Sequence, residues 1–264
     1  MDPNSILKTG EKVLNTAPTF YNDALEPTVK ETGKVLERIP KMINAALAPL
    51  NIWILKKEYN INETKKILAK KLENIDPNKI VSPEPYVAVP ALQAISYSIN
   101  SDELRNMYAN LLAKSMNFDT KDVVHPSFAE IIKQMSPFDA KLLKLFSNSP
   151  QHPIIKIRYE LSEQNPIGFD YINHIVSPEL GISIQTYKKY AVSIDNLIRL
   201  NLVNVTYNNY LTDQKFYNNI LNSTFIKQLD PKSNLPENYG HVNFKKGILT
   251  ITNLGNSFTS ICIF

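Results

Sequence analysis

Histidine and cysteine, the side chains that most often hold metal ions or act as bases and nucleophiles, are few and scattered in this chain. Cys262 is the only cysteine in the sequence, so a thiolate zinc site and an intrachain disulfide are excluded. The four histidines are too far apart to share one helix face as an HExxH zinc site requires, since they stand at His125, His152, His174 and His241. Residue types and spacing therefore predict no metal centre.

Glycine-rich phosphate loops are also missing from the sequence. The dinucleotide fingerprint and the Walker loop both need two glycines within about five positions, so that backbone can approach a phosphate. No two of the seven glycines are that close, and no GxSxG nucleophile elbow occurs. His125 and Glu130, five positions apart, would point to different sides of a helix and make a poor acid–base pair. We therefore predict a protein that is not an enzyme and holds no cofactor.

The composition is that of an ordinary folded protein. Of the 264 residues, 43% are hydrophobic and 20% are charged, and the net charge is +4. Such a balance gives no strong field for nucleic acid or lipid. A chain of this length buries roughly 75% of its unfolded surface, enough for one large domain or two small ones. The single cysteine and an N-terminus without a hydrophobic signal core favour a cytoplasmic location.

A row of apolar and small residues with alternating steps of four and three runs through the N-terminal part. It predicts a helical heptad seam, which would pack within the molecule or, alternatively, against a second copy. Pro40 and Pro49 predict kinks or breaks in this helix. The seam positions are Leu25, Val29, Thr32, Leu36, Ile39, Ile43, Ala46, Leu50 and Trp53.

The uncharged segment 42–55 (MINAALAPLNIWIL) overlaps this seam. Its 14 residues are fewer than the number, about 20, that a bilayer-spanning helix needs. We interpret it as a buried helix, with contact to a membrane surface as the alternative. In that alternative the protein would lie peripherally at the inner face of the membrane.

Further helices are predicted in the N-terminal half. Asn60 or Asn62 is a suitable N-cap for a helix with a lysine-rich outer side. Segment 76–90 contains four prolines and predicts an extended strap. Ser101 is a suitable cap for a strongly amphipathic helix through Ser115. We interpret residues 1–135 as a multi-helix domain, which ends with a short helix over 125–135.

The second half predicts both helices and strands. Residues 154–161 fit either state, and an asparagine-rich polar stretch precedes the last strand. The clearer elements are a helix opened by Ser136 and Pro137, a helix over 186–201, strands over 202–207 and 247–252, and a final helix from Asn253. This order is typical of winged-helix modules. We therefore predict a mainly α fold, with an N-terminal multi-helix domain (1–135) and an α+β, winged-helix-like C-terminal domain (136–264).

One predicted surface has the residues to contact nucleic acid. A helix over 186–201 beside a two-stranded wing would enter a major groove. Against this, Asp195 lies on the same helix and the chain has only four arginines, so the basic footprint is sparse. We rank a structural or protein-contact role above DNA binding. The candidate nucleic-acid contacts are Lys188, Lys189, Arg199, Lys245 and Lys246.

Three runs resemble the bacterial abortive-infection alpha family. They are 26–50 (EPTVKETGKVLERIPKMINAALAPL), 81–117 (VSPEPYVAVPALQAISYSINSDELRNMYANLLAKSMN) and 124–146 (VHPSFAEIIKQMSPFDAKLLKLF). The third run contains the junction that we take as the family signature, formed by His125, Pro126, Phe128, Ser136 and Pro137. The resemblance implies an antiphage protein and brings no catalytic residues with it.

We therefore predict a non-enzymatic antiphage protein of the abortive infection type that acts through protein or membrane contacts. Its partner would be a second copy of itself or a phage or host protein. A phage-derived trigger would release the packed seam for assembly or membrane contact. The alternatives are a winged-helix regulator that binds DNA and an enzyme with an unrecognised site.

Overall fold

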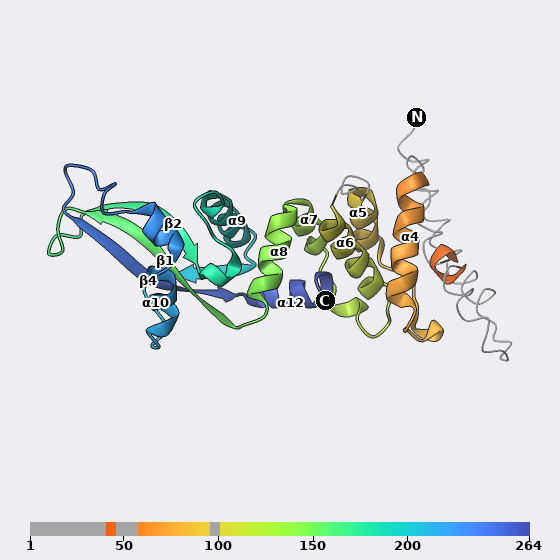
Figure 1. Cartoon of the computed structure of the whole chain (residues 1–264). Coiled ribbons are helices and arrows are strands. Elements are labelled where there is room, and N and C mark those ends of the chain that lie inside the picture. The colour runs from red at the N-terminus through yellow and green to blue at the C-terminus, as the bar shows by residue number, and fades with distance from the viewer. Residues whose placement is uncertain (1–40, 46–57, 96–100) are drawn as a thin grey trace, which may run out of the picture. The chain divides into compact units, whose positions relative to one another are not determined.

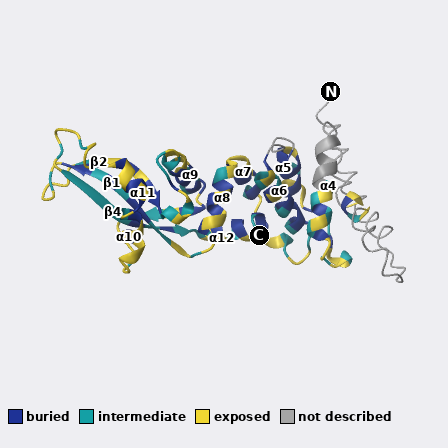
Figure 2. Cartoon of the chain, in the orientation of Figure 1, coloured by how far each residue is buried: buried dark blue, intermediate teal, exposed yellow. Residues whose placement is uncertain are grey.

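The computed structural model describes residues 41–45, 58–95 and 101–264 (Figure 1). The chain divides into two compact units, residues 1–133 and residues 134–264, which we call unit 1 and unit 2. Each unit buries its own set of large apolar side chains, drawn in dark blue in Figure 2.

Most of the predicted heptad seam lies outside the described residues. Residues 41–45 are helical, and Ile43 within them is fully buried. The kinks predicted at Pro40 and Pro49 and most of the uncharged segment fall outside the described ranges. So do the other seam positions, Leu25, Val29, Thr32, Leu36, Ile39, Ala46, Leu50 and Trp53.

The described part of unit 1 is a group of helices around α6. α6 (Asp102–Ser115) contacts α4 (Glu58–Leu72), α5 (Pro85–Ile95) and α7 (Ser127–Lys133). Ser101 caps α6 as predicted, because its hydroxyl accepts a hydrogen bond from the Leu104 N–H at 3.3 Å. The predicted periodicity is confirmed as well, since the buried residues of α6 include Met107, Tyr108, Leu111, Leu112 and Ser115.

The predicted extended strap over 76–90 is wrong in its second half. A 3-10 turn (Pro77–Lys79) and a short extended stretch lead into α5, which begins at Pro85. Proline is tolerated at the first helical position because an N–H there has no partner inside the helix. Pro90 removes one hydrogen bond inside α5, but apolar burial against α6 and α7 outweighs that loss. The residues that α5 buries are Val87, Ala88, Ala91, Leu92, Ala94 and Ile95.

The predicted caps of α4 are also wrong. The helix already includes Glu58, so Asn60 and Asn62 lie inside it. Its later part fits the prediction, since Leu68 is fully buried and Lys66 is exposed. The periodicity identified the buried side of this helix but not its start, because an asparagine inside a helix looks the same in sequence as one that caps it.

Unit 2 combines helices with a four-stranded antiparallel sheet, in the strand order β2-β1-β4-β3. The described chain is therefore mixed α+β rather than mainly helical. In chain order the elements are α8 (Pro137–Phe146), β1 (Gln151–Glu160), β2 (Gly168–Val176), a 3-10 turn (Pro178–Leu180), α9 (Tyr187–Arg199), β3 (Val203–Thr206), α10 (Lys215–Leu221), α11 (Thr224–Leu229), β4 (His241–Ile251) and α12 (Asn253–Cys262).

The winged-helix arrangement predicted for 136–264 is not confirmed. A wing would pair β3 with β4 as a two-stranded ribbon, but β4 pairs along almost its whole length with β1 and only over its last residues with β3. β4 is thus an inner strand of the sheet (Figure 1). In addition, α10 and α11 occupy the stretch between β3 and β4, where the sequence indicates only a polar insertion.

β2 is an element that the sequence does not predict. Its pairing with β1 shifts twice, because Asn173 and His174 together lie opposite Lys156, and Tyr171 has no counterpart. Such bulges interrupt the alternation of inward and outward residues by which a strand is recognised. His174 also has a φ of 61°, a left-handed conformation that is uncommon outside glycine.

The sheet has one polar and one apolar face along β1. Successive strand residues point to opposite faces, so Lys156, Arg158 and Glu160 share one face, while Ile155, Ile157 and Tyr159 share the other. α9 lies on the polar face, where its Asp195 contacts β2, and α10 lies on the apolar face against β1.

Candidate functional site

A connected set of polar side chains covers the polar face of the unit 2 sheet. We call it the His174 network. It consists of two hydrogen-bonded groups, one around His174 and one around Asp170, which are linked by the contact of Lys156 with the Tyr207 ring, and it joins β1, β2, β4, α9 and the residue that follows β3. Its members are Lys156, Arg158, Glu160, Asp170, His174, Asp195, Tyr207 and Asn243.

His174 stands at the centre of the network. Its Nε2 lies 3.0 Å from Asp195 Oδ1, and its Nδ1 lies 3.1 Å from the Tyr207 hydroxyl. The backbone N–H of His174 also donates to that hydroxyl, at 3.3 Å. The bulge in β2 and the left-handed φ turn this histidine away from the regular strand direction, so that one residue joins β2 to α9 and to the end of β3.

Burial sets the protonation of this group. It lowers the pKa of His174, although the nearby Asp195 carboxylate acts in the opposite direction. It also raises the pKa of Tyr207, so the phenol keeps its proton. A neutral imidazole that accepts from Tyr207 at Nδ1 and donates from Nε2 to Asp195 satisfies all three groups. A carboxylate, an imidazole and a hydroxyl in a row resemble a catalytic relay, but a phenol whose pKa is raised is a poor nucleophile.

A close approach of backbone makes room for Tyr207. A Cβ atom on Gly247 of β4 would lie 2.6 Å from the Tyr207 ring and 2.5 Å from the Thr206 carbonyl oxygen. Glycine therefore lets the ring pass close over β4, so that its hydroxyl reaches His174 in β2, three strands along the sheet from β3. The Lys156 ammonium lies 4.8 Å from the centre of the same ring.

The second half of the network is a set of ion pairs. The Asp170 carboxylate accepts from Lys156 at 2.8 Å and from Arg158. Burial by itself would raise the pKa of Asp170, but these two cations outweigh it and hold the pKa below its usual value. Arg158 also donates to Glu160 at 3.3 Å, and both oxygens of this buried carboxylate accept from the Asn243 amide. The charges are thus neutralised by one another.

No pattern in the sequence predicts this network. Its members come from five segments that are far apart in the chain, and no short motif links them.

Two further predictions concern the single cysteine and metal sites. Cys262 is buried in α12, and burial raises the pKa of its thiol. Across the described ranges, no cluster of three or more histidine, cysteine, aspartate or glutamate residues could hold a metal ion.

The predicted nucleic-acid contacts on α9 are engaged within unit 2. Lys189 lies 4.2 Å from the centre of the Phe138 ring, and Lys188 lies 5.9 Å from that of Tyr187. Arg199 donates to the side chains of Asn196 and Gln134. Arg199 therefore ties the end of α9 to the chain just before α8.

The two lysines predicted on the second strand of the wing do not share a surface. Lys245 and Lys246 are neighbours in β4, so they point to opposite faces of the sheet. Lys245 lies opposite Lys156 on the polar face, whereas Lys246 reaches Gln214 and the Tyr217 ring on the apolar face. The five basic residues thus do not form one basic patch.

The family-signature junction contributes helix starts and core packing. Ser136 and Asp139 form a reciprocal capping box at the start of α8, with Pro137 at the first helical position. Asp139 is buried and also accepts from Asn196 of α9 at 2.9 Å. In unit 1, Phe128 of α7 is fully buried, and His125 lies before the helix, with its Nδ1 2.7 Å from the Ser127 hydroxyl. Pro126 is exposed between them.

A second feature of unit 2 was missed in the sequence, and it is apolar. We call it the hairpin-end cluster, at the β1–β2 turn (Figure 1). Tyr159 and Phe169 are paired across β1 and β2, and the Leu161 N–H bonds to the Ile167 carbonyl two positions beyond, after the Glu160–Gly168 pair. Alternation therefore puts these side chains on the apolar face. The cluster consists of Tyr159, Leu161, Ile167, Phe169, Tyr171 and Tyr239.

Most of the hairpin-end cluster is open to solvent (Figure 2). The exposed fractions are 68% for Ile167, 42% for Phe169, 40% for Leu161 and 36% for Tyr171. The rings nonetheless support one another, since Phe169 meets Tyr159 and Tyr239 edge to face with centroids 5.6 Å and 5.2 Å apart. Tyr171 stacks on Tyr159 at 4.5 Å. The alternation of Ile167, Phe169 and Tyr171 was a signal that the sequence did contain.

None of the helices in the described ranges combines the length and the apolar composition needed to cross a bilayer.

No curated protein matches the chain. Among solved structures, it is similar to an uncharacterized protein from the hydrocarbon-degrading marine bacterium Alcanivorax borkumensis SK2. The sequence identity is 14% and the TM-score 0.35, over 56% of this chain and 96% of the other, a likeness too low to carry an argument. The model of the abortive infection alpha family matches residues 56–262. The chain therefore belongs to the abortive infection alpha family.

Proposed function

We propose that this protein takes part in abortive infection by binding another protein, not by making or breaking covalent bonds. The observation that carries the proposal is the contrast within unit 2. The groups that could do chemistry, in the His174 network, are hydrogen-bonded or ion-paired to one another, while the large apolar side chains of the hairpin-end cluster face solvent. An exposed apolar patch of this kind is typical of a contact surface.

The geometry of the network supports a structural role for it. The Tyr207 hydroxyl and one carboxylate oxygen of Asp195 both bond to His174, and the result is a link between β2, α9 and the end of β3. Asp170 holds β1 to β2 through Lys156 and Arg158 in the same way. A network that ties these elements together around a bulged edge strand contributes to the stability of unit 2.

A phage challenge separates contact from chemistry. Bacteria would carry the wild-type chain, an empty vector, or the double variant Asp195→Asn with Tyr207→Phe, which removes the acid and the hydroxyl with little change of shape. We expect fewer plaques with the wild type than with the vector, and the double variant to protect as well as the wild type. A second double variant, Ile167→Ser with Phe169→Ser, should protect no better than the vector.

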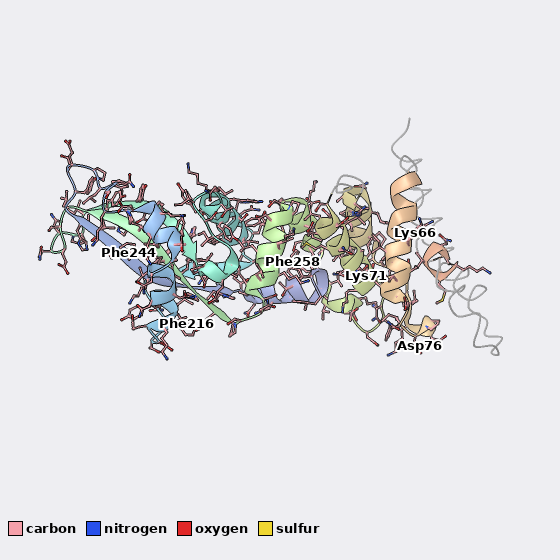
Figure 3. All side chains as sticks on the ribbon, viewed as in Figure 1. Lys66, Lys71, Asp76, Phe216, Phe244 and Phe258 are labelled. Atoms are coloured by element: carbon pink, nitrogen blue, oxygen red, sulfur yellow. The ribbon has the colours of Figure 1, made fainter. Side chains whose placement is uncertain are left out.

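Three results would contradict the proposal. Equal plaque counts for wild type and vector would remove the defence role. Loss of protection in Asp195→Asn with Tyr207→Phe, at an unchanged melting temperature, would indicate that the relay performs chemistry. Full protection by a folded Ile167→Ser, Phe169→Ser variant would remove the hairpin-end cluster as the contact surface. Phe216→Ser on α10 is the matched control, because Phe216 is 49% exposed at a different place in unit 2 (Figure 3).

A further inference from the structure

We infer that the hairpin-end cluster binds a segment of a partner protein in which apolar side chains are flanked by lysine or arginine. The inference rests on the proposed function, since it takes the cluster to be the contact surface. It adds the chemical class of the partner, which follows from the shape, the rigidity and the charge of this end of the sheet.

The apolar part of the surface is preformed. Leu161 and Ile167 stand opposite each other at the turn, next to the Tyr159–Phe169 pair. The turn itself is closed by two backbone hydrogen bonds between Ser162 and Asn165, each of 3.2 Å. Rings that already contact one another lose little side-chain entropy when a partner binds, so they make efficient anchors.

The charges around these side chains are acidic. Within the turn, residues 161–167, the only charged side chain is Glu163, and within the segment 233–240 it is Glu237; both are exposed. The nearest arginine, Arg158, is already bonded to Asp170 and Glu160. An apolar patch with exposed glutamates two positions from Leu161 and two positions from Tyr239 attracts a basic segment and repels an acidic one. The same charges disfavour the anionic surface of a membrane.

The backbone at this edge limits how the partner can bind. β2 is an edge strand, but its bulges at Tyr171 and at Asn173–His174 interrupt a regular pairing edge. Bulges of this kind protect an edge from adding a long strand. The partner segment is therefore held through side chains, with the apolar residues on Ile167 and Phe169 and the basic residues near Glu163 and Glu237.

The test is a selection from a random library of 12-residue peptides on the immobilised full-length chain. We expect the enriched peptides to carry aromatic or branched apolar residues flanked by lysine or arginine. One enriched peptide, measured by fluorescence anisotropy, should bind Ile167→Ser with Phe169→Ser at least about tenfold more weakly. The control variant Phe216→Ser should bind it like the wild type. The affinity of the peptide for the wild-type chain should fall as the salt concentration is raised.

A charge reversal makes the test sharper. The variant Glu163→Lys with Glu237→Lys should select peptides with aspartate or glutamate in place of the basic residues. The inference is overturned if the wild type enriches no peptide above the blank matrix, if the enriched peptides show no basic bias, or if the charge reversal leaves their composition unchanged.

Two further measurements test whether a lipid surface or a second copy of the chain binds the hairpin-end cluster instead. Sedimentation of the wild type with phosphatidylglycerol vesicles, lost in Ile167→Ser with Phe169→Ser, would overturn the inference in favour of a lipid surface. A concentration-dependent dimer in light scattering, lost in the same variant, would overturn it in favour of a second copy. Failure of the peptide selection leaves the phage result standing, whereas equal plaque counts for wild type and vector remove the proposed function whatever the peptides do.

Discussion

The polar face and the hairpin end of the unit 2 sheet differ in how far their side chains are exposed to solvent. On the polar face, Lys156 and Arg158 expose only 14% and 22% of their side chains and are bonded to Asp170. At the hairpin end, Ile167 exposes 68% of its surface to water. The charged side chains around Asp170 are thus largely buried and paired within the fold, while the apolar side chains at the hairpin end face solvent. This contrast indicates where function lies better than residue type alone.

The hairpin end should depend for its stability on the close backbone contact between β1 and β2 at Gly168. A Cβ on Gly168 would lie 1.8 Å from the Tyr159 carbonyl oxygen and 2.9 Å from the Cα of Glu160. Gly168→Ala must push β1 and β2 apart, and we expect it to lower the free energy of unfolding by about 3 kcal/mol in urea denaturation. Gln164→Ala, exposed in the same turn, is the control. A loss below about 1 kcal/mol for Gly168→Ala would show that the two strands can separate easily.

The next effect tests the ion pairs of the polar face. Asp170→Ala leaves Lys156 and Arg158 partly buried without their carboxylate, and we expect a loss of about 2 kcal/mol. Asp122→Ala in unit 1 removes an ion pair with Lys121, but Asp122 is 84% exposed, so the change should be much smaller than for Asp170→Ala. Equal losses for both variants would contradict the structural role assigned to the network.

The His174 imidazole predicts a pH dependence of stability. Its pKa is lower in the folded protein than the ordinary value of 6.5, so the unfolded chain binds the proton more tightly. Stability should therefore fall as the pH drops from 6.5 to the folded pKa, with a slope of at most about 1.4 kcal/mol per pH unit from this group. Below the folded pKa the slope from this group ends.

His174→Asn removes that slope. Asparagine tolerates a left-handed φ, so the bulge can be kept. His125→Asn serves as the control, because His125 is an exposed histidine in unit 1. Denaturation curves at several pH values between 5 and 7.5 provide the measurement. If the wild type and His174→Asn show the same dependence, some other group is responsible.

The smallest expected effect on stability belongs to the hairpin end. Ile167→Ser should change the free energy of unfolding by no more than about 0.5 kcal/mol, because the side chain makes few buried contacts to lose. Protection against phage should nevertheless fall. A variant that keeps its stability and loses its function would define the contact surface directly, while one that loses both would place Ile167 in the core.

Local signals predicted several elements of the fold. Ser101 and the periodic residues after it define α6, and Ser136 with Pro137 defines the start of α8. The helix α9 and the strand β3 also follow from their patterns. In each case the information lies within one or two helical turns or a few strand residues, so no distant part of the chain is needed to read it.

The rest depends on contacts between distant residues. Pro90 forbids a helix on local grounds, and only the burial of α5 against other helices reverses that expectation. The bulges of β2 exist because His174 has partners in α9 and after β3, 21 and 33 positions away. The winged-helix prediction is not confirmed for the same reason, because β4 pairs over almost its whole length with β1, at the other end of unit 2 in sequence.

The closed turn at Ser162 and Asn165, with exposed side chains on either side of it, has an evolutionary consequence. In the binding mode that we propose, replacing Ile167 or Glu163 would alter what the surface recognises, while the residues that hold the hairpin in place would stay as they are. Recognition and folding can then change independently, one substitution at a time. A host protein that must follow a rapidly diversifying opponent gains from that separation.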